Sequence, residues 1–160
     1  MNMNAQAFTQ YKKATYETAS PEKLLIMLYD GAIRNIKNAQ NAIANNDINL
    51  AHLQIMKTEE IIIELMSTLN MDYEISKSLF NLYEYFYQQL VQANIKKDVE
   101  LLKQVESFFS ELRDTWNEAM KKVKNVPSED QPKVVADNPV LTINKPAPPT
   151  EMKKSINIQG

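Results

Sequence analysis

The chain has 160 residues, a formal net charge of -2 and 44% apolar residues, enough to form the core of one domain. It contains no cysteine, which excludes disulfides and thiolate chemistry, and its near-zero charge gives no attraction to nucleic acid or anionic lipid. Since no apolar run is long enough to span a bilayer and no signal peptide is evident, we expect a cytoplasmic protein without membrane insertion.

A helix-start signal follows the first 18 residues. Ser20 can cap a helix with its hydroxyl, Pro21 suits the first helical position, and Glu22 complements the positive helix end. Apolar residues then recur with helical spacing until Asn45-Asn46-Asp47 interrupts the pattern. The same spacing predicts further helices over residues 48–69, 74–93 and 98–124. Because connections of a few residues require antiparallel neighbours, the sequence predicts an all-α fold, an antiparallel up-down four-helix bundle.

Two segments of different composition flank the predicted bundle. Residues 7–17 are amphipathic and carry Phe8, Tyr11 and Tyr16, which we predict to form a short N-terminal cap on the bundle. At the other end, six of the seven prolines lie within residues 127–149, a stretch without an aromatic residue or helical periodicity. The sequence therefore predicts a bundle domain over residues 1–125 and a Pro-rich disordered tail over residues 126–160.

The apolar stripes of the four predicted helices differ in width. The stripe of the last helix covers an arc of only about 120°, which is one ordinary buried face. The other three helices carry further apolar residues beside their main stripe, namely Ile26, Ile33, Leu50, Ile61, Leu65, Phe80, Tyr87 and Val91. These residues predict an apolar groove that the N-terminal cap partly covers and that an apolar partner can occupy. Two alternatives remain: each wide stripe meets two neighbouring helices, or the surplus forms a homo-oligomeric interface in a structural helical bundle.

The sequence offers no catalytic, cofactor or metal site. A carboxylate-bridged metal pair in a bundle needs a Glu–His pair on each of two helices, whereas His52 is the single histidine and is expected at the surface. Glu59 and Glu60 are adjacent and point in different directions, so we interpret them as solvated charges. Glycines occur only at 31 and 160, which excludes a Gly-rich phosphate loop. We therefore predict a protein that is not an enzyme.

Several stretches follow a recognisable order and spacing. They are Tyr11, Thr18-Ala19-Ser20-Pro21-Glu22, Leu24, Met27-Leu28-Tyr29-Asp30-Gly31-Ala32, Leu82-Tyr83-Glu84-Tyr85, Ala93-Asn94, Glu111-Leu112-Arg113 and Thr115-Trp116. Together they resemble the flagellin export chaperones, the FliS family. The resemblance spans about residues 8–123 and leaves the Pro-rich segment outside.

The resemblance implies a function that fits the surplus of apolar surface. Members of the family are four-helix bundles that bind the C-terminal segment of flagellin and prevent its premature polymerisation in the cytoplasm. They then deliver it to a component of the flagellar type III export gate, without a cofactor. The apolar groove predicted above is the candidate binding surface for that segment. We expect the free protein to be a monomer or a weak dimer.

Overall fold

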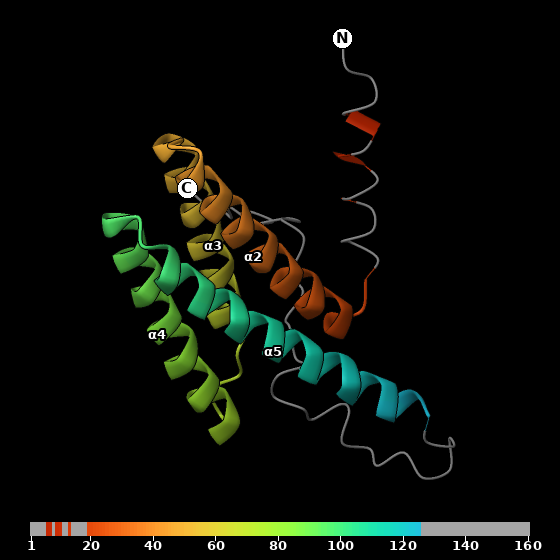
Figure 1. Ribbon diagram of the computed structural model, residues 1–160. Coiled ribbons are helices and arrows are strands. Elements are labelled where there is room, and N and C mark those ends of the chain that lie inside the picture. The colour runs from red at the N-terminus through yellow and green to blue at the C-terminus, as the bar shows by residue number, and fades with distance from the viewer. Residues whose placement is uncertain (1–5, 8, 11–12, 14–18, 126–160) are drawn as a thin grey trace, which may run out of the picture.

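Four helices joined by short turns form an antiparallel bundle, as the sequence predicts (Figure 1). The computed structural model describes residues 6–7, 9–10, 13 and 19–125, and helices are the only regular elements within that part. The helices are α2 (Pro21–Ala44), α3 (Ile48–Ser67), α4 (Glu74–Lys96) and α5 (Val99–Lys124). The predicted cap residues Phe8, Tyr11 and Tyr16 and the predicted tail, residues 126–160, lie outside the described residues.

Side-chain caps begin three of the four helices. The Ser20 hydroxyl accepts a hydrogen bond from the backbone N–H of Lys23 at 3.3 Å, and Pro21 occupies the first turn of α2. Asp47 and Asp98 cap α3 and α5, with carboxylate oxygens 3.0 Å and 2.9 Å from backbone nitrogens. These caps satisfy N–H groups that have no partner inside a helix, so the predicted starting points are confirmed.

Two helix ends differ from the predicted positions. α3 ends at Ser67, two residues early, whereas α4 continues for one turn beyond Ala93. The turn after α4 contains Lys97 at φ 49°, in the left-handed region, and the backbone N–H of Asp98 donates to the carbonyl of Ala93 at 3.0 Å. Since glycine or asparagine usually occupies such a position, a lysine there gives no stop signal in the sequence.

The four helices form a ring of neighbours. α2 packs against α3 and α5, and α4 packs against the same two helices, which places α2 and α4 on a diagonal. Figure 1 shows α4 and α5 diverging from the turn that joins them, with α5 extending past α4. As a result, the fully buried side chains of α5 all lie in its first half.

The second half of α5 departs from the single buried face that its narrow stripe predicts. Leu102, Val105 and Phe109 are buried, whereas Leu112, Trp116 and Met120 are half-buried and Val123 is exposed. The prediction was wrong here because residue spacing gives the width of an apolar stripe only. It does not show how far along the stripe a neighbouring helix continues to cover it. Surplus apolar surface is therefore not confined to the first three helices.

A pair of tyrosine hydroxyls joins the two diagonal helices inside the core. Tyr29 of α2 and Tyr83 of α4 are fully buried, and their hydroxyl oxygens lie 2.6 Å apart. Burial raises the pKa of Tyr29 to about 12, although hydrogen bonds with Tyr83 and Trp116 act in the opposite direction. Burial also raises the pKa of Tyr83. Both side chains are therefore neutral at physiological pH, and the pair satisfies two polar groups that water cannot reach.

Candidate binding surface

The eight residues of the predicted groove do not form one surface. Ile33 and Leu65 are only 5% and 1% exposed and belong to the buried core, so their placement on an exposed groove was wrong. On α3 the buried line runs through Ile55, Thr58, Ile62 and Leu65. A threonine fits this line because its hydroxyl donates to the backbone carbonyl of Gln54 at 3.0 Å. The sequence prediction left the polar Thr58 out of the buried face, and the predicted centre of that face was therefore displaced around the helix.

Ile26 and Ile33 lie on the side of α2 that faces α5. Asp30, one turn beyond Ile26, accepts a hydrogen bond from the Arg113 guanidinium of α5 at 3.2 Å. Farther along this side, Gln40 donates to Glu106 of α5 at 2.7 Å. Polar contacts therefore line the seam between α2 and α5. Ile26 is half-buried and lies apart from the predicted residues of α3 and α4.

Leu50 and Ile61 lie on the side of α3 that faces α2. Ile61 is half-buried over Gly31, where an added Cβ would lie 3.3 Å from the Ile61 Cδ1 atom. The absence of a side chain at Gly31 therefore allows a close approach of the two helices. Leu50 is exposed near the turn between α2 and α3. Of the predicted residues, these two share a face of α3 but are separated by three helical turns.

Phe80, Tyr87 and Val91 are half-buried along the side of α4 that faces α3. Asn94 identifies this side, because its side-chain nitrogen is 2.9 Å from Nδ1 of His52 on α3. Asn94 lies seven residues after Tyr87, which is two helical turns, so both side chains are on the same side of α4. His52 is exposed, as predicted, and its ring makes a contact between two helices. Three of the eight predicted residues therefore lie on one side of α4, with the exposed Glu84 between Phe80 and Tyr87.

Met56 and Ile63 of α3 complete this surface, and the sequence prediction missed both. They lie about 40° and about 20° around the helix from His52, on the side that faces α4. Their side chains are 41% and 53% exposed. The signal was the run Ile61-Ile62-Ile63, because three consecutive helical residues point in directions about 100° apart and cannot all be buried. Here Ile62 is buried and Ile63 faces solvent.

We call the surface formed by Met56, Ile63, Phe80, Tyr87 and Val91 the α3–α4 flank. Glu59 lies on the same side of α3 and is half-buried, whereas Glu60 is exposed. Burial raises the pKa of Glu59, and attraction to His52 partly opposes the rise. The prediction of a solvated charge is therefore correct for Glu60, whereas Glu59 is an incompletely hydrated carboxylate beside an apolar surface.

Neither a metal site nor a membrane-spanning helix occurs in the described part of the chain. No group of three or more His, Cys, Asp or Glu side chains there is arranged to hold a metal ion. None of the described helices combines the length and apolar character that crossing a membrane requires.

A family model described as flagellar protein FliS matches residues 3–123, which include all four helices almost to the end of α5. This chain belongs to the FliS family. The match confirms the resemblance that the sequence motifs indicated, and the Pro-rich residues 126–160 lie outside it.

Curated FliS proteins from distant bacteria share most of their length with this chain. The flagellar secretion chaperone FliS of Bacillus subtilis is 40% identical over 113 residues, covering 71% of this chain and 85% of the relative. Those of Vibrio cholerae and Campylobacter jejuni are each 32% identical, over 114 and 117 residues. These alignments cover 68% and 72% of this chain and 84% and 91% of the relatives. Membership of this chaperone family supports an export-chaperone role for the bundle.

Proposed function

We propose that this FliS-family protein binds the C-terminal segment of flagellin in the cytoplasm and prevents its premature polymerisation. It then delivers flagellin to a component of the flagellar type III export gate. The observation that carries the proposal is the α3–α4 flank, on a bundle whose relatives are named flagellar secretion chaperones. In this flank Met56 and Ile63 are exposed, and the three residues of α4 are half-buried. A chaperone needs such a surface because it must cover apolar side chains that would otherwise associate with other subunits.

The α3–α4 flank suits an amphipathic helix of the client. Phe80, Tyr87 and Val91 are spaced by seven and four residues along α4, so all three can contact the apolar face of a helix lying beside them. Glu84 lies between Phe80 and Tyr87 and can pair with a polar or basic residue of that helix. Met56 adds a flexible side chain that adapts to different partners. Ordering a segment on binding costs about 2–5 kcal/mol, which keeps the complex reversible and allows release at export.

The other predicted residues have different roles in this proposal. Ile26, Leu50 and Ile61 remain partly accessible and are candidate secondary contacts, whereas Ile33 and Leu65 support the helices from inside the core. The N-terminal cap, Phe8, Tyr11 and Tyr16, is proposed to compete with the client for apolar surface. Such competition lowers the apparent affinity by the fraction of time that the cap is closed.

The test combines calorimetry with mass measurement in solution. A synthetic peptide of the flagellin C-terminal segment from the same bacterium is titrated into the full-length protein, and light scattering gives the mass before and after binding. A monomer that forms a one-to-one complex is expected. A stable oligomer that does not respond to the peptide would contradict the proposal and would favour a structural bundle that uses its apolar surface for self-association.

A further inference from the structure

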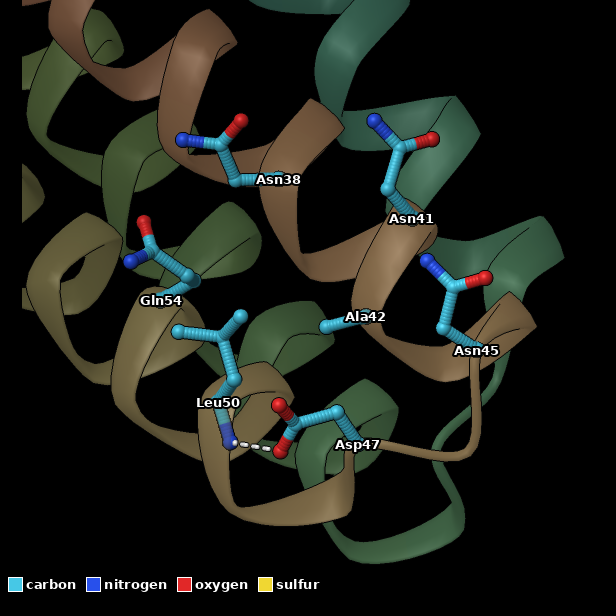
Figure 2. A pocket seen from close by; sticks show the side chains of 7 residues that line it. All are labelled: Asn38, Asn41, Ala42, Asn45, Asp47, Leu50 and Gln54. Atoms are coloured by element: carbon cyan, nitrogen blue, oxygen red, sulfur yellow. Dashed lines mark hydrogen bonds between the residues drawn. The ribbon is translucent and has the colours of Figure 1, made fainter.

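Glu59 is a carboxylate within the apolar α3–α4 flank. It follows Met56 by three residues and precedes Ile63 by four, so its side chain lies on the same side of α3 as both. Glu59 is half-buried, and its carboxylate makes no hydrogen bond or ion pair within the part of the chain that the structure describes. Asp47, at the start of the same helix, differs because its carboxylate accepts a hydrogen bond from the backbone N–H of Leu50 at 3.0 Å and caps α3 (Figure 2). Glu59 has no comparable structural role.

The contact between His52 and Asn94 shows where Glu59 lies along the flank. The side-chain nitrogen of Asn94 on α4 is 2.9 Å from Nδ1 of His52 on α3. Because the two helices are antiparallel, seven residues forward along α3 and seven residues back along α4 reach the same height, which places Glu59 level with Tyr87. Tyr87 is the middle one of the three α4 residues in the flank. A client helix that covers the flank therefore also covers Glu59.

The basic side chains near the two ends of the flank already have partners. Lys77, close to the beginning of α4, is 2.8 Å from the Glu74 carboxylate. Lys97, which follows α4, donates to the backbone carbonyl and to the side-chain oxygen of Asn94, at 2.6 Å in both cases. On α4 the exposed Glu84 adds a second negative charge beside the flank. The centre of this apolar surface is therefore negatively charged.

The charge of Glu59 does not stabilise the free bundle. Burial raises the pKa of Glu59, and attraction to His52 only partly offsets the rise. The ionised carboxylate is therefore less favourable in the folded chain than in the unfolded chain, so at neutral pH its charge opposes folding. A role in binding accounts for a charge that the fold does not use.

Binding of the client would remove the remaining water from this carboxylate. An unpaired charge is costly to bury, so an apolar or acidic side chain placed over Glu59 would oppose binding. A lysine or arginine at the same place would instead pair with the carboxylate through a charge-assisted hydrogen bond. Apolar contacts alone would not distinguish between these client helices, whereas Glu59 does.

We propose that Glu59 determines specificity by pairing with a lysine or arginine of the client helix that covers the α3–α4 flank. This inference rests on the proposed function and adds a charge requirement to it. The occupant of the flank is an amphipathic helix of the flagellin segment that carries one basic residue among the apolar residues of its buried face.

The variant E59Q removes the charge and keeps the size and the helix propensity of the side chain. E60Q is the matched control, because Glu60 is the next residue, is exposed and points about 100° away around α3. Thermal unfolding by circular dichroism should give E59Q a Tm equal to or above that of the unmodified protein. A lower Tm in E59Q alone would show that the carboxylate stabilises the free bundle, and would overturn the inference.

Calorimetry with the synthetic flagellin C-terminal peptide tests the pairing on the full-length protein. E59Q should bind the peptide about tenfold more weakly, as expected for the loss of a hydrogen bond to a charged group, and E60Q should bind normally. Tighter binding by E59Q would show that an apolar or acidic residue covers Glu59. That result, a loss below about fivefold, or an equal loss in E60Q overturns the inference.

Peptide variants identify the partner of Glu59. Each lysine or arginine of the peptide is replaced in turn by glutamine, and one replacement should weaken binding to the unmodified protein about tenfold while causing little further loss with E59Q. If no replacement behaves in this way, the inference is overturned. These outcomes leave the proposed function intact, since it requires only that the unmodified protein bind the unmodified peptide. Absence of that binding overturns the proposed function itself, and with it the role of Glu59.

Discussion

The adjacent residues Ile62 and Ile63 allow the core and the α3–α4 flank to be tested separately. Ile62 is 0% exposed, so truncation to alanine should reduce the free energy of unfolding by about 2–5 kcal/mol through lost burial and a residual cavity. For a bundle of this size that corresponds to a fall in Tm on the order of 10 °C or more. Ile63 is 53% exposed, and its truncation should change the free energy of unfolding by less than about 0.5 kcal/mol.

The expected effects on binding are reversed. Complete burial of an isoleucine contributes about 1.5–3 kcal/mol, and a client can bury roughly the half of Ile63 that remains exposed. Ile63→Ala should therefore weaken the complex by about 1 kcal/mol, or about fivefold in Kd, and Met56→Ala in the same chain should weaken it further. Ile62→Ala should bind normally at temperatures where it remains folded.

The assay is thermal unfolding by circular dichroism together with calorimetric titration of the flagellin C-terminal peptide, on both single variants. A large fall in Tm for Ile63→Ala with none for Ile62→Ala would show that Ile63, and not Ile62, lies on the buried face of α3. A folded Ile63→Ala variant with unchanged affinity would show that the α3–α4 flank is not the client surface. The client would then have to bind elsewhere on the bundle.

Four further predictions concern the core and the two ends of the chain. Tyr29→Phe leaves the Tyr83 hydroxyl buried without its partner and should lower the free energy of unfolding by about 1–3 kcal/mol in denaturant titrations, whereas Y29F/Y83F should recover part of the loss. Because the pKa of Tyr29 rises from about 10 to about 12 on folding, stability should be constant up to about pH 10 and decrease towards pH 12, as alkaline unfolding monitored by tyrosinate absorbance can show. Removal of residues 126–160 should leave helix content and client affinity nearly unchanged, since α5 ends at Lys124, and a large fall in Tm would contradict this. Deletion of residues 1–16 should increase dye binding or self-association, and loss of client binding by a folded deletion variant would refute the cap model.

The sequence predicts most of the fold because the relevant signals are local. Ser20, Asp47 and Asp98 are N-cap residues whose short side chains accept hydrogen bonds from nearby backbone N–H groups, so they mark the starts of three helices. The helical spacing of apolar residues then predicts how far each helix extends. Lys97 gives no comparable signal, since its left-handed conformation is unusual for a residue with a side chain.

The candidate site is less predictable because exposure depends on neighbours that are distant in the sequence. Thr58 lies in the core, where its hydroxyl donates to a backbone carbonyl. The sequence prediction did not count this polar residue as part of the buried face, so it placed Leu65 in the groove although Leu65 is buried. Likewise, periodicity shows that Ile61, Ile62 and Ile63 cannot all be buried, but only the packing of α2 and α4 decides which of them faces solvent. Phe80, Tyr87 and Val91 are predicted to share a surface because their spacing places all three beside the core line of the same helix.

The hydrogen bond between the Tyr29 and Tyr83 hydroxyls also restricts how the helices can slide past one another. Apolar side chains tolerate an axial shift, since one leucine can replace another in the same space, but a shift of α2 relative to α4 by one turn, about 5.4 Å, would separate the hydroxyl oxygens. Two buried polar groups would then lack partners, at a cost that exceeds the bond's own net contribution to stability. The pair thereby selects a single register for the diagonal helices. A protein that presents an apolar surface to a flexible client benefits from this, because the rows of side chains on that surface keep a fixed alignment.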